Sequence, residues 1–200
     1  SALLDTVRVS FNRISVDGDT STNDTCLVLA NGLAGNPSIT SQGADYDAFL
    51  EALRALCVEM ARRIAADGEG AKHMITCTVE GATDEAQAER IAKSVISSTL
   101  TKAAIFGADA NWGRVLCAMG YSGEAFDPDK VDVSFISAAG SVAVCAQGRG
   151  LDFDEEAAKR ILTEHDVTIA VAMGEGNGAC TCWGCDITYD YIKINGDYRT

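Results

Sequence analysis

The chain has 200 residues, of which 47% are hydrophobic, so it is long enough to bury a sizeable core as one domain or two small ones. Its formal net charge of −13 at pH 7 disfavours binding to nucleic acid and to anionic membrane surfaces, because both would repel it. No stretch approaches the roughly 20 apolar residues that span a bilayer, and the N-terminal sequence lacks the layout of a secretory signal. Small molecules or protein partners are the expected ligands.

The first part of the chain is predicted to form two strands separated by loops. Residues 7–16 alternate apolar and polar side chains, which predicts a strand, and the apolar residues 25–30 predict a second one. The stretches 17–24 and 31–46 are rich in Asp, Gly, Ser and Asn and predict loops.

A long amphipathic helix is predicted from Asp47 to the glycines at 68 and 70, which favour helix ends. Its apolar residues recur at steps of three and four and form one face, made of Phe49, Leu53, Leu56, Met60 and Ile64.

The rest of the chain mixes strands and helices. We predict a strand at 73–81, a helix at 83–107 with Thr83 as N-cap, a loop entering an apolar helix or strand at 108–123, strands at 130–138 and 141–148, a short helix at 154–165, an apolar run at 166–174 and a final strand at 185–195. This order fits an α+β or layered α/β architecture better than an all-helical or all-β one.

Eight cysteines are present, and most stand alone inside apolar stretches, as buried free thiols do in a reducing compartment. This usage predicts a cytoplasmic protein. Cys180, Cys182 and Cys185 resemble part of a metal site, but the two histidines, His73 and His165, have no spacing that completes four ligands. We therefore expect no metal there.

Two acidic stretches admit a functional and a structural interpretation. Asp17, Asp19 and Asp24 could suggest calcium, but the distal Glu and central Gly of a calcium loop are absent, and such residues also bond their own backbone in tight turns. Glu69 lies between two glycines, which let a ligand approach the backbone closely, although an exposed carboxylate is by default solvated.

Four segments stand in a recognisable order along the chain: SFNRISVDGDTSTNDT, DGEGAK, FGADANWGR and WGCDITYDYIKINGDYRT. Together they resemble, over nearly the whole chain, the β subunit of ornithine acetyltransferase, the glutamate N-acetyltransferase of arginine biosynthesis. The resemblance implies a layered α/β/β/α sandwich of the α+β class over residues 1–200. It leaves open a C-terminal subdomain from about residue 98 onward.

The resemblance also implies acetyl transfer from N-acetylornithine to glutamate, and it leaves open whether acetyl-CoA serves as a donor. In that family a precursor cleaves itself before a threonine, which then carries the acetyl group and whose free amino group can act as the base. Nothing before Ser10 matches the motif around that threonine, so we expect the nucleophile upstream of Ser1 and reject Ser1 itself. The chain, as a β subunit trimmed at its start, is expected to be inactive alone and to need an α chain in an α2β2 heterotetramer.

Three substrate contacts carry over from the family motifs: Glu69 in DGEG, and Asn195 and Thr200 in NGDYRT. A carboxylate can pair with the ammonium group of an amino acid while amide and hydroxyl groups orient the rest. The resemblance implies no cofactor, treats the tail as a strand leading into a substrate pocket, and makes the three tail cysteines packing residues.

Two alternatives remain. A fragment without the nucleophile could serve as an assembly or binding module, which the sequence upstream of Ser1 would decide. Another N-terminal-nucleophile amidohydrolase of similar fold would hydrolyse its substrate instead of transferring an acetyl group.

Overall fold

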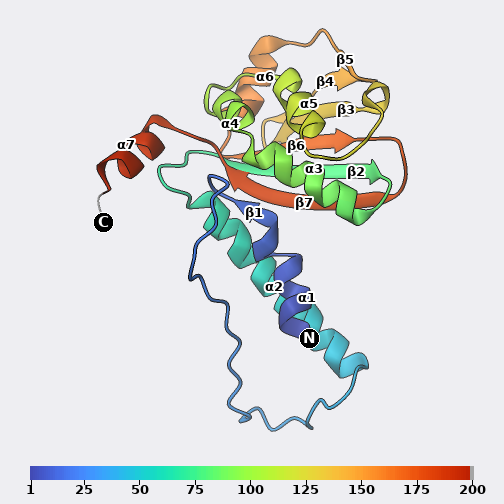
Figure 1. The fold of residues 1–200 in the computed structure, drawn as a ribbon, viewed down its shortest axis with the longest axis vertical. Coiled ribbons are helices and arrows are strands. Elements are labelled where there is room, and N and C mark those ends of the chain that lie inside the picture. The colour runs from blue at the N-terminus through green and yellow to red at the C-terminus, as the bar shows by residue number, and fades with distance from the viewer. Residues whose placement is uncertain (199–200) are drawn as a thin grey trace.

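One mixed sheet of seven strands organises residues 1–198, which the computed structural model describes (Figure 1). Its order from edge to edge is β1-β7-β2-β6-β3-β4-β5. The strands are β1 (Ile14–Ser15), β2 (Met74–Ala82), β3 (Asp132–Ser137), β4 (Gly140–Ala146), β5 (Arg149–Gly150), β6 (Asp166–Ala172) and β7 (Gly178–Cys185). β1 runs parallel to β7 and β2 to β6, whereas the other neighbours are antiparallel. The predicted α+β class is confirmed.

The helices are α1 (Ala2–Arg8), α2 (Ala44–Ala66), α3 (Glu85–Ser97), α4 (Thr99–Phe106), α5 (Trp112–Gly120), α6 (Glu155–Leu162) and α7 (Tyr189–Asp197), with 3-10 turns at Phe11–Arg13 and Pro128–Lys130. α3, α5 and α6 share one hydrophobic core with the sheet. α1 and α2 lie side by side beyond the β1 edge, and α7 projects from the end of β7 (Figure 1).

The strands bury one face because their side chains alternate. In β2, Ile75, Cys77 and Val79 are buried in the core, whereas Thr76 and Thr78 between them are only half-buried. Strands alternate their side chains with a period of two, so the apolar set meets the helices and the small polar set faces away. The strands predicted at 73–81, 130–138 and 141–148 are confirmed as β2, β3 and β4. The helix predicted at 154–165 is confirmed as α6.

The two strands predicted near the N-terminus are wrong. Only Ile14 and Ser15 pair in the sheet, opposite Trp183 and Gly184, and residues 2–8 form a helix instead. Residues 25–30 form no strand and are exposed, with Leu29 at 89%. Apolar character makes a strand only where a neighbouring strand supplies hydrogen bonds, and no strand among residues 1–198 lies beside this segment.

The helix predicted at 83–107 is two helices. Ser98 leaves the helical conformation with ψ 114°, and its hydroxyl accepts a hydrogen bond from the Thr101 backbone N–H, which starts α4. The N-cap of α3 is Asp84, one residue after the predicted Thr83, and it accepts from the Gln87 N–H. A second capping residue therefore divides what the apolar spacing presents as continuous.

The predicted final strand at 185–195 is also wrong, because β7 ends at Cys185 and a helix follows. The Thr188 hydroxyl accepts from the Tyr191 N–H at 3.1 Å and donates to the Gly70 carbonyl at 2.7 Å. This cap begins α7, whose side chains are exposed or half-buried. The tail therefore presents a helix and not a strand.

The proposed boundary near residue 98 crosses one sheet. β2 lies before that residue in the sequence, and both of its neighbours, β6 and β7, lie after it. The separate C-terminal subdomain stays a prediction.

Candidate active site

Two of the three predicted substrate contacts lie against each other. The Asn195 side-chain amide donates to Glu69 Oε2 at 3.2 Å, although 126 positions separate the two residues in the chain. Both side chains are exposed, so a ligand can reach them. Thr200, the third predicted contact, lies outside the described residues.

The turn that carries Glu69 holds α7 in place. Gly70 has φ +68°, and a Cβ there would lie 2.8 Å from both the Asp190 Cβ and the Tyr191 backbone nitrogen. Only glycine combines this left-handed conformation with so close an approach. The Asn195 amide also donates to the Tyr191 carbonyl at 3.1 Å, which aims it along the helix toward Glu69.

Tyr191 and Asp17 extend the site on its other side. The Tyr191 hydroxyl donates to Asp17 Oδ2 at 2.9 Å, and the other Asp17 oxygen accepts from the Asp19 N–H at 2.9 Å. Burial, the hydrogen bond to Asp17 and the carboxylate charges raise the pKa of Tyr191 to about 12. Asp17 thus closes its own turn, as the structural interpretation proposed, and also holds α7.

A buried carboxylate fixes the backbone between Glu69 and β2. Asp186 accepts from the backbone N–H groups of Lys72 and His73 at 2.9 and 3.1 Å, and its second oxygen lies 2.7 Å from His73 Nδ1. Burial acts to raise the pKa of Asp186, but the hydrogen bonds from His73 and Lys72 outweigh it and lower the pKa below its usual range. The group therefore stays ionised at neutral pH.

Cys185 joins the segments that carry Asp17 and Glu69. Its Sγ lies 3.9 Å from the Val16 carbonyl oxygen, and a Cβ on Gly68 would lie only 2.6 Å from that sulfur. The buried ammonium of Lys102 donates to the Cys185 carbonyl, and burial lowers the pKa of Lys102. The end of β7 is thus tied to α4 and to both loops of the site.

The comparison with known proteins agrees with the motifs. Residues 1–200 match the ArgJ family over their whole length. This chain belongs to the ArgJ family. It is 53% identical over 199 residues to the arginine biosynthesis bifunctional protein ArgJ 1 of Clostridium acetobutylicum. This alignment covers 100% of this chain and 49% of that protein. The Symbiobacterium thermophilum ArgJ is 51% identical, with 100% and 48% covered.

The structure also matches a solved ArgJ chain. The crystal structure of ArgJ from Bacillus halodurans superposes with a TM-score of 0.92 at 44% identity, covering 98% of this chain and 91% of that one. The chain spans about half the length of the curated ArgJ relatives, but nearly all of the solved ArgJ chain. The solved ArgJ chain is thus itself about half as long as those relatives.

The tail cysteines of this ArgJ chain do not converge. Cys180 and Cys182 lie in the core with their sulfurs 3.9 Å apart, whereas Cys185 contacts Val16 and Lys102 at the end of β7. Among residues 1–198 no group of three or more His, Cys, Asp or Glu side chains could hold a metal ion. The expected absence of a metal stays a prediction, which elemental analysis checks.

No helix within residues 1–198 of this ArgJ chain is long and apolar enough to cross a membrane.

The sequence did not reveal Tyr191 as a member of the site, and it suggested Asp17 only for calcium or for a tight turn, not as a partner of α7. Tyr191 and Asn195 are four residues apart, a spacing that places them on one face of a helix. In the predicted strand these two side chains would also share a face, because strand side chains alternate with a period of two, so their spacing does not distinguish a strand from a helix.

Proposed function

We propose that the complete protein transfers acetyl from N-acetylornithine to glutamate, and that this chain supplies part of the amino acid site. The observation that carries the proposal is the contact between Glu69 and Asn195, two motif residues that the fold of an ArgJ chain brings together. The relatives are named bifunctional proteins of arginine biosynthesis, which supports this substrate class.

The chemistry proceeds in two balanced half-reactions. A threonine hydroxyl, upstream of Ser1, attacks the acetyl carbonyl of N-acetylornithine, and the C–N bond breaks as the ornithine amine takes up the hydroxyl proton. The amine of glutamate then attacks the acetyl ester, and the C–O bond breaks as the threonine oxygen regains a proton. The free amino group of that threonine is its base, so self-cleavage of a precursor creates nucleophile and base together.

Residues of this chain bind and orient. Glu69 presents a carboxylate that can pair with a substrate ammonium, and the Asn195 amide both steadies this carboxylate and can donate to a substrate oxygen. Thr200 is proposed as the third contact. The proposal includes no cofactor; acetyl-CoA as an alternative acetyl donor is left to direct assay.

The proposal includes a second chain and a cytoplasmic location. The complementary half of the protein would supply the nucleophile's surroundings, in an α2β2 assembly, and the half-length solved ArgJ chain supports the division into two chains. All eight cysteines are free thiols, which supports a reducing compartment.

Steady-state kinetics of Glu69→Gln in the assembled enzyme test the proposal. The substitution keeps the size and hydrogen-bonding reach of the side chain but removes its charge, so binding should weaken by about 1.5–3 kcal/mol, seen mainly in KM. Glu164→Gln, at an exposed position after α6, is the matched control and should change nothing. Unchanged acetyl transfer by Glu69→Gln would refute the site, and hydrolysis without transfer to glutamate would favour an amidohydrolase.

A further inference from the structure

The first half of β7 carries two thiols side by side. Cys180 and Cys182 point to the same face of the strand, because strand side chains alternate with a period of two. Their sulfurs lie 3.9 Å apart, and both side chains belong to the hydrophobic core. Neither thiol has a part in the acetyl transfer described above.

The two thiols differ in exposure and in acidity. Cys180 is 5% exposed, whereas Cys182 is completely buried. The hydrogen bond with the Cys182 thiol and the nearby charge of Arg13 lower the pKa of Cys180, although burial acts to raise it. The same hydrogen bond, together with burial, raises the pKa of Cys182. Since the thiolate is the form that reacts with oxidants, Cys180 is the thiol that reacts first.

Arg13 supplies a buried positive charge beside this pair. It ends the 3-10 turn Phe11–Arg13, which lies against β7, and it is only 9% exposed. Its Nη2 donates to Glu85, but its buried Nε has no hydrogen-bond partner. The charges of Glu89 and Glu85 oppose its effect on Cys180, yet the pKa of Cys180 stays lowered. A guanidinium in this position stabilises a thiolate nearby.

Cys77 is the competing partner for Cys182, since it lies directly opposite that residue on β2. It is completely buried, and burial raises its pKa. Side chains directly opposite each other in antiparallel strands have Cβ atoms about 4.5–5.5 Å apart, whereas a disulfide has them about 3.8 Å apart. Cys180 therefore combines the better acidity with the only solvent contact among the three thiols.

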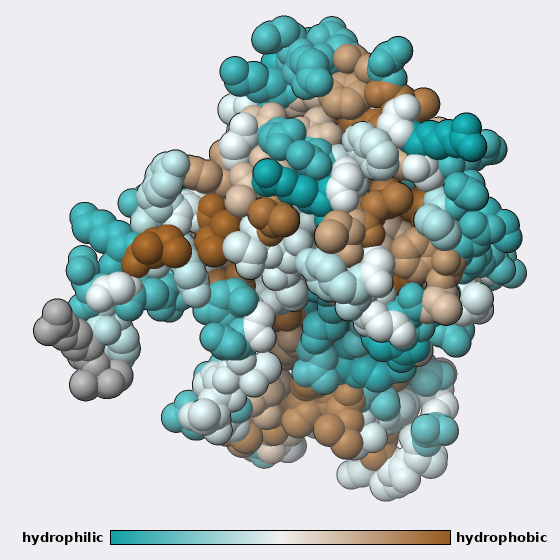
Figure 2. Space-filling model, turned by 45° about the horizontal axis from the view of Figure 1, so that its top comes forward, coloured by the Kyte–Doolittle hydropathy of each residue, from teal (hydrophilic) through white to brown (hydrophobic). Residues whose placement is uncertain are grey.

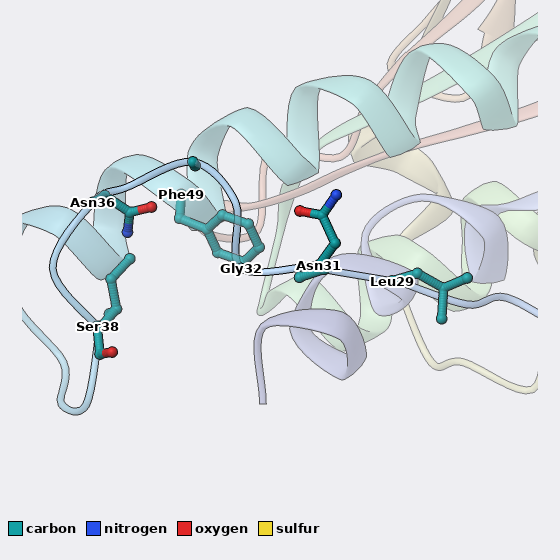
Figure 3. Close-up of a pocket in the computed structure, with 9 residues that line it drawn as sticks. Leu29, Asn31, Gly32, Asn36, Ser38 and Phe49 are labelled. Carbon is teal, nitrogen blue, oxygen red and sulfur yellow. The ribbon is translucent and has the colours of Figure 1, made fainter.

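The surroundings of Cys180 have room for a small oxidant only. Ion pairs of Arg8 and Arg13 with Glu85 join the N-terminal segment to α3. In Figure 2 hydrophilic surface lies between the body of the molecule and its lower end, where Figure 1 places α1 and α2. The open hollow of about 960 Å³ lies elsewhere, between residues 29–39 and Phe49, and no cysteine lines it (Figure 3). Hydrogen peroxide, a molecule little larger than water, is an oxidant that suits this site.

We propose that Cys180 and Cys182 are a peroxide-sensitive thiol pair that closes to a disulfide. The Cys180 sulfur attacks one oxygen of hydrogen peroxide, the O–O bond breaks, and the thiol proton leaves with the other oxygen as water. The Cys182 sulfur then attacks the sulfenic sulfur of Cys180, the S–O bond breaks, and the hydroxyl leaves with the Cys182 proton as a second water. The two thiols lose two electrons and two protons, and one peroxide becomes two water molecules.

The disulfide would bend β7. Residues two positions apart in a strand have Cα atoms about 6.4–6.8 Å apart, which is the upper limit for a disulfide. The sulfurs would also have to close from 3.9 Å to bonding distance. Only β2 pairs with β7 at Cys180 and Cys182, because β1 pairs further along, with Trp183 and Gly184. One edge of β7 is thus unpaired at the bend.

The bend reaches the candidate active site through β1. The residues of β1 pair with those that directly follow Cys182, and Asp17 comes two positions after β1. Asp17 accepts from the Tyr191 hydroxyl, which holds α7. Oxidation should therefore loosen α7 and raise the KM of the assembled enzyme at least about threefold. This effect on KM rests on the proposed function, whereas formation of the disulfide does not.

Mass spectrometry of the complete enzyme, before and after hydrogen peroxide, tests the proposal. The chain should lose about 2 Da, the mass of two thiol hydrogens, and dithiothreitol should restore both the mass and KM. Trypsin leaves the three tail cysteines in the peptide 161–193, and chymotrypsin then cuts after Trp183, which separates Cys185 from the other two. The fragment that ends at Trp183 should carry the loss of about 2 Da and resist alkylation.

Variants assign the roles of the two thiols. Cys182→Ser should stop at the sulfenic acid of Cys180, which dimedone traps, and Cys180→Ser should form neither product. Cys182→Ala repeats the first test with a side chain that suits the core. Cys117→Ser, at an exposed cysteine of α5, is the control and should form the disulfide as wild type does.

Three results would overturn the proposal. They are free, alkylated Cys180 and Cys182 after peroxide treatment, a disulfide that includes Cys77 or Cys185, and a Cys180–Cys182 disulfide that leaves KM unchanged. The mass measurement on wild type needs no variant, so misfolding of a variant cannot obscure it. An unaltered KM in Glu69→Gln would count against the proposed function alone and would leave the disulfide standing.

Discussion

Asp186 shows how one buried carboxylate positions a site that it does not enter. Its side chain is fully buried and accepts three hydrogen bonds from Lys72 and His73, just after the turn that carries Glu69. A buried anion persists only where such donors replace water. The backbone that leads from Glu69 into β2 is therefore held by charge-assisted hydrogen bonds.

We expect Asp186→Asn to destabilise the protein by about 1.5–3 kcal/mol at neutral pH. The charge-assisted hydrogen bonds are lost, and the asparagine NH₂ group would face the N–H donors of Lys72 and His73. The pKa of Asp186 is lower in the folded than in the unfolded state. Its contribution is thus present above the unfolded value of about 3.9 and is lost as the pH falls through the folded value. Urea unfolding between pH 3 and 7 measures this.

The difference between wild type and Asp186→Asn should therefore shrink at the acid end. Asp166→Asn serves as the control, because Asp166 is exposed and bonds only to the neighbouring His165. A difference that stays constant across this pH range would show that Asp186 acts through packing and not through its charge.

At the scale of elements, α7 is held in place from outside rather than by its own packing. Its residues are exposed or half-buried, and it is attached through Thr188, Gly70 and the hydroxyl of Tyr191. A helix of this length is marginal in water without tertiary support. Its position, and with it that of Asn195, therefore depends on the turn at Gly70.

Gly70→Ala should cost about 1–3 kcal/mol and weaken substrate binding, because alanine is strained at φ +68° and its Cβ would meet Asp190. Gly196→Ala is the matched control, since nothing lies within 4 Å of a Cβ there and the residue is within α7. That change should stabilise the helix by about 0.5–1 kcal/mol. Thermal unfolding and KM for both variants check this, and equal behaviour of the two would contradict the role assigned to the turn.

At the scale of the whole molecule, the sheet core is buried, whereas Phe49, Leu56, Met60 and Ile64 of α2 stay about half exposed among residues 1–198. The core joins α3, α5 and α6 to the central strands, and the residues that share it are buried. The segment 17–43, in contrast, is exposed throughout. Exposed apolar side chains gathered on one side of a molecule are typical of an interaction surface.

We expect the isolated chain to show no acetyl transfer and to be cut by chymotrypsin after Leu27, Leu29 or Leu33. Assembly with the complementary half should protect these bonds, because the segment would then be buried. Trypsin is the control, since residues 17–43 contain no Lys or Arg. Mass spectrometry of the fragments measures the protection; acetyl transfer by the chain alone, or cleavage unchanged by assembly, would contradict this division of labour.

The spacing of apolar side chains and the capping residues were sufficient to predict an element wherever that segment packs against the core of its own chain. Val167, Ile169 and Val171 alternate with less buried residues in β6, and the Asp154 side chain caps α6 as its position before two glutamates suggests. The motif residues Glu69 and Asn195 could be chosen from the sequence because of the family resemblance. Their mutual contact could not be foreseen, since it depends on where α7 lies.

The sequence by itself determined the α+β class, the central strands, the long helix of α2 and the membership of the ArgJ family, because period, caps and ordered motifs are properties of the chain alone. Only the tertiary structure decided that residues 189–197 form a helix, that 25–30 form no strand, and that the apolar face of α2 points outward. In each case the deciding partner is distant in the sequence or absent from residues 1–198. The spacing of apolar residues shows which side chains share one face of a helix or strand. Which segment packs against that face is decided by the tertiary structure.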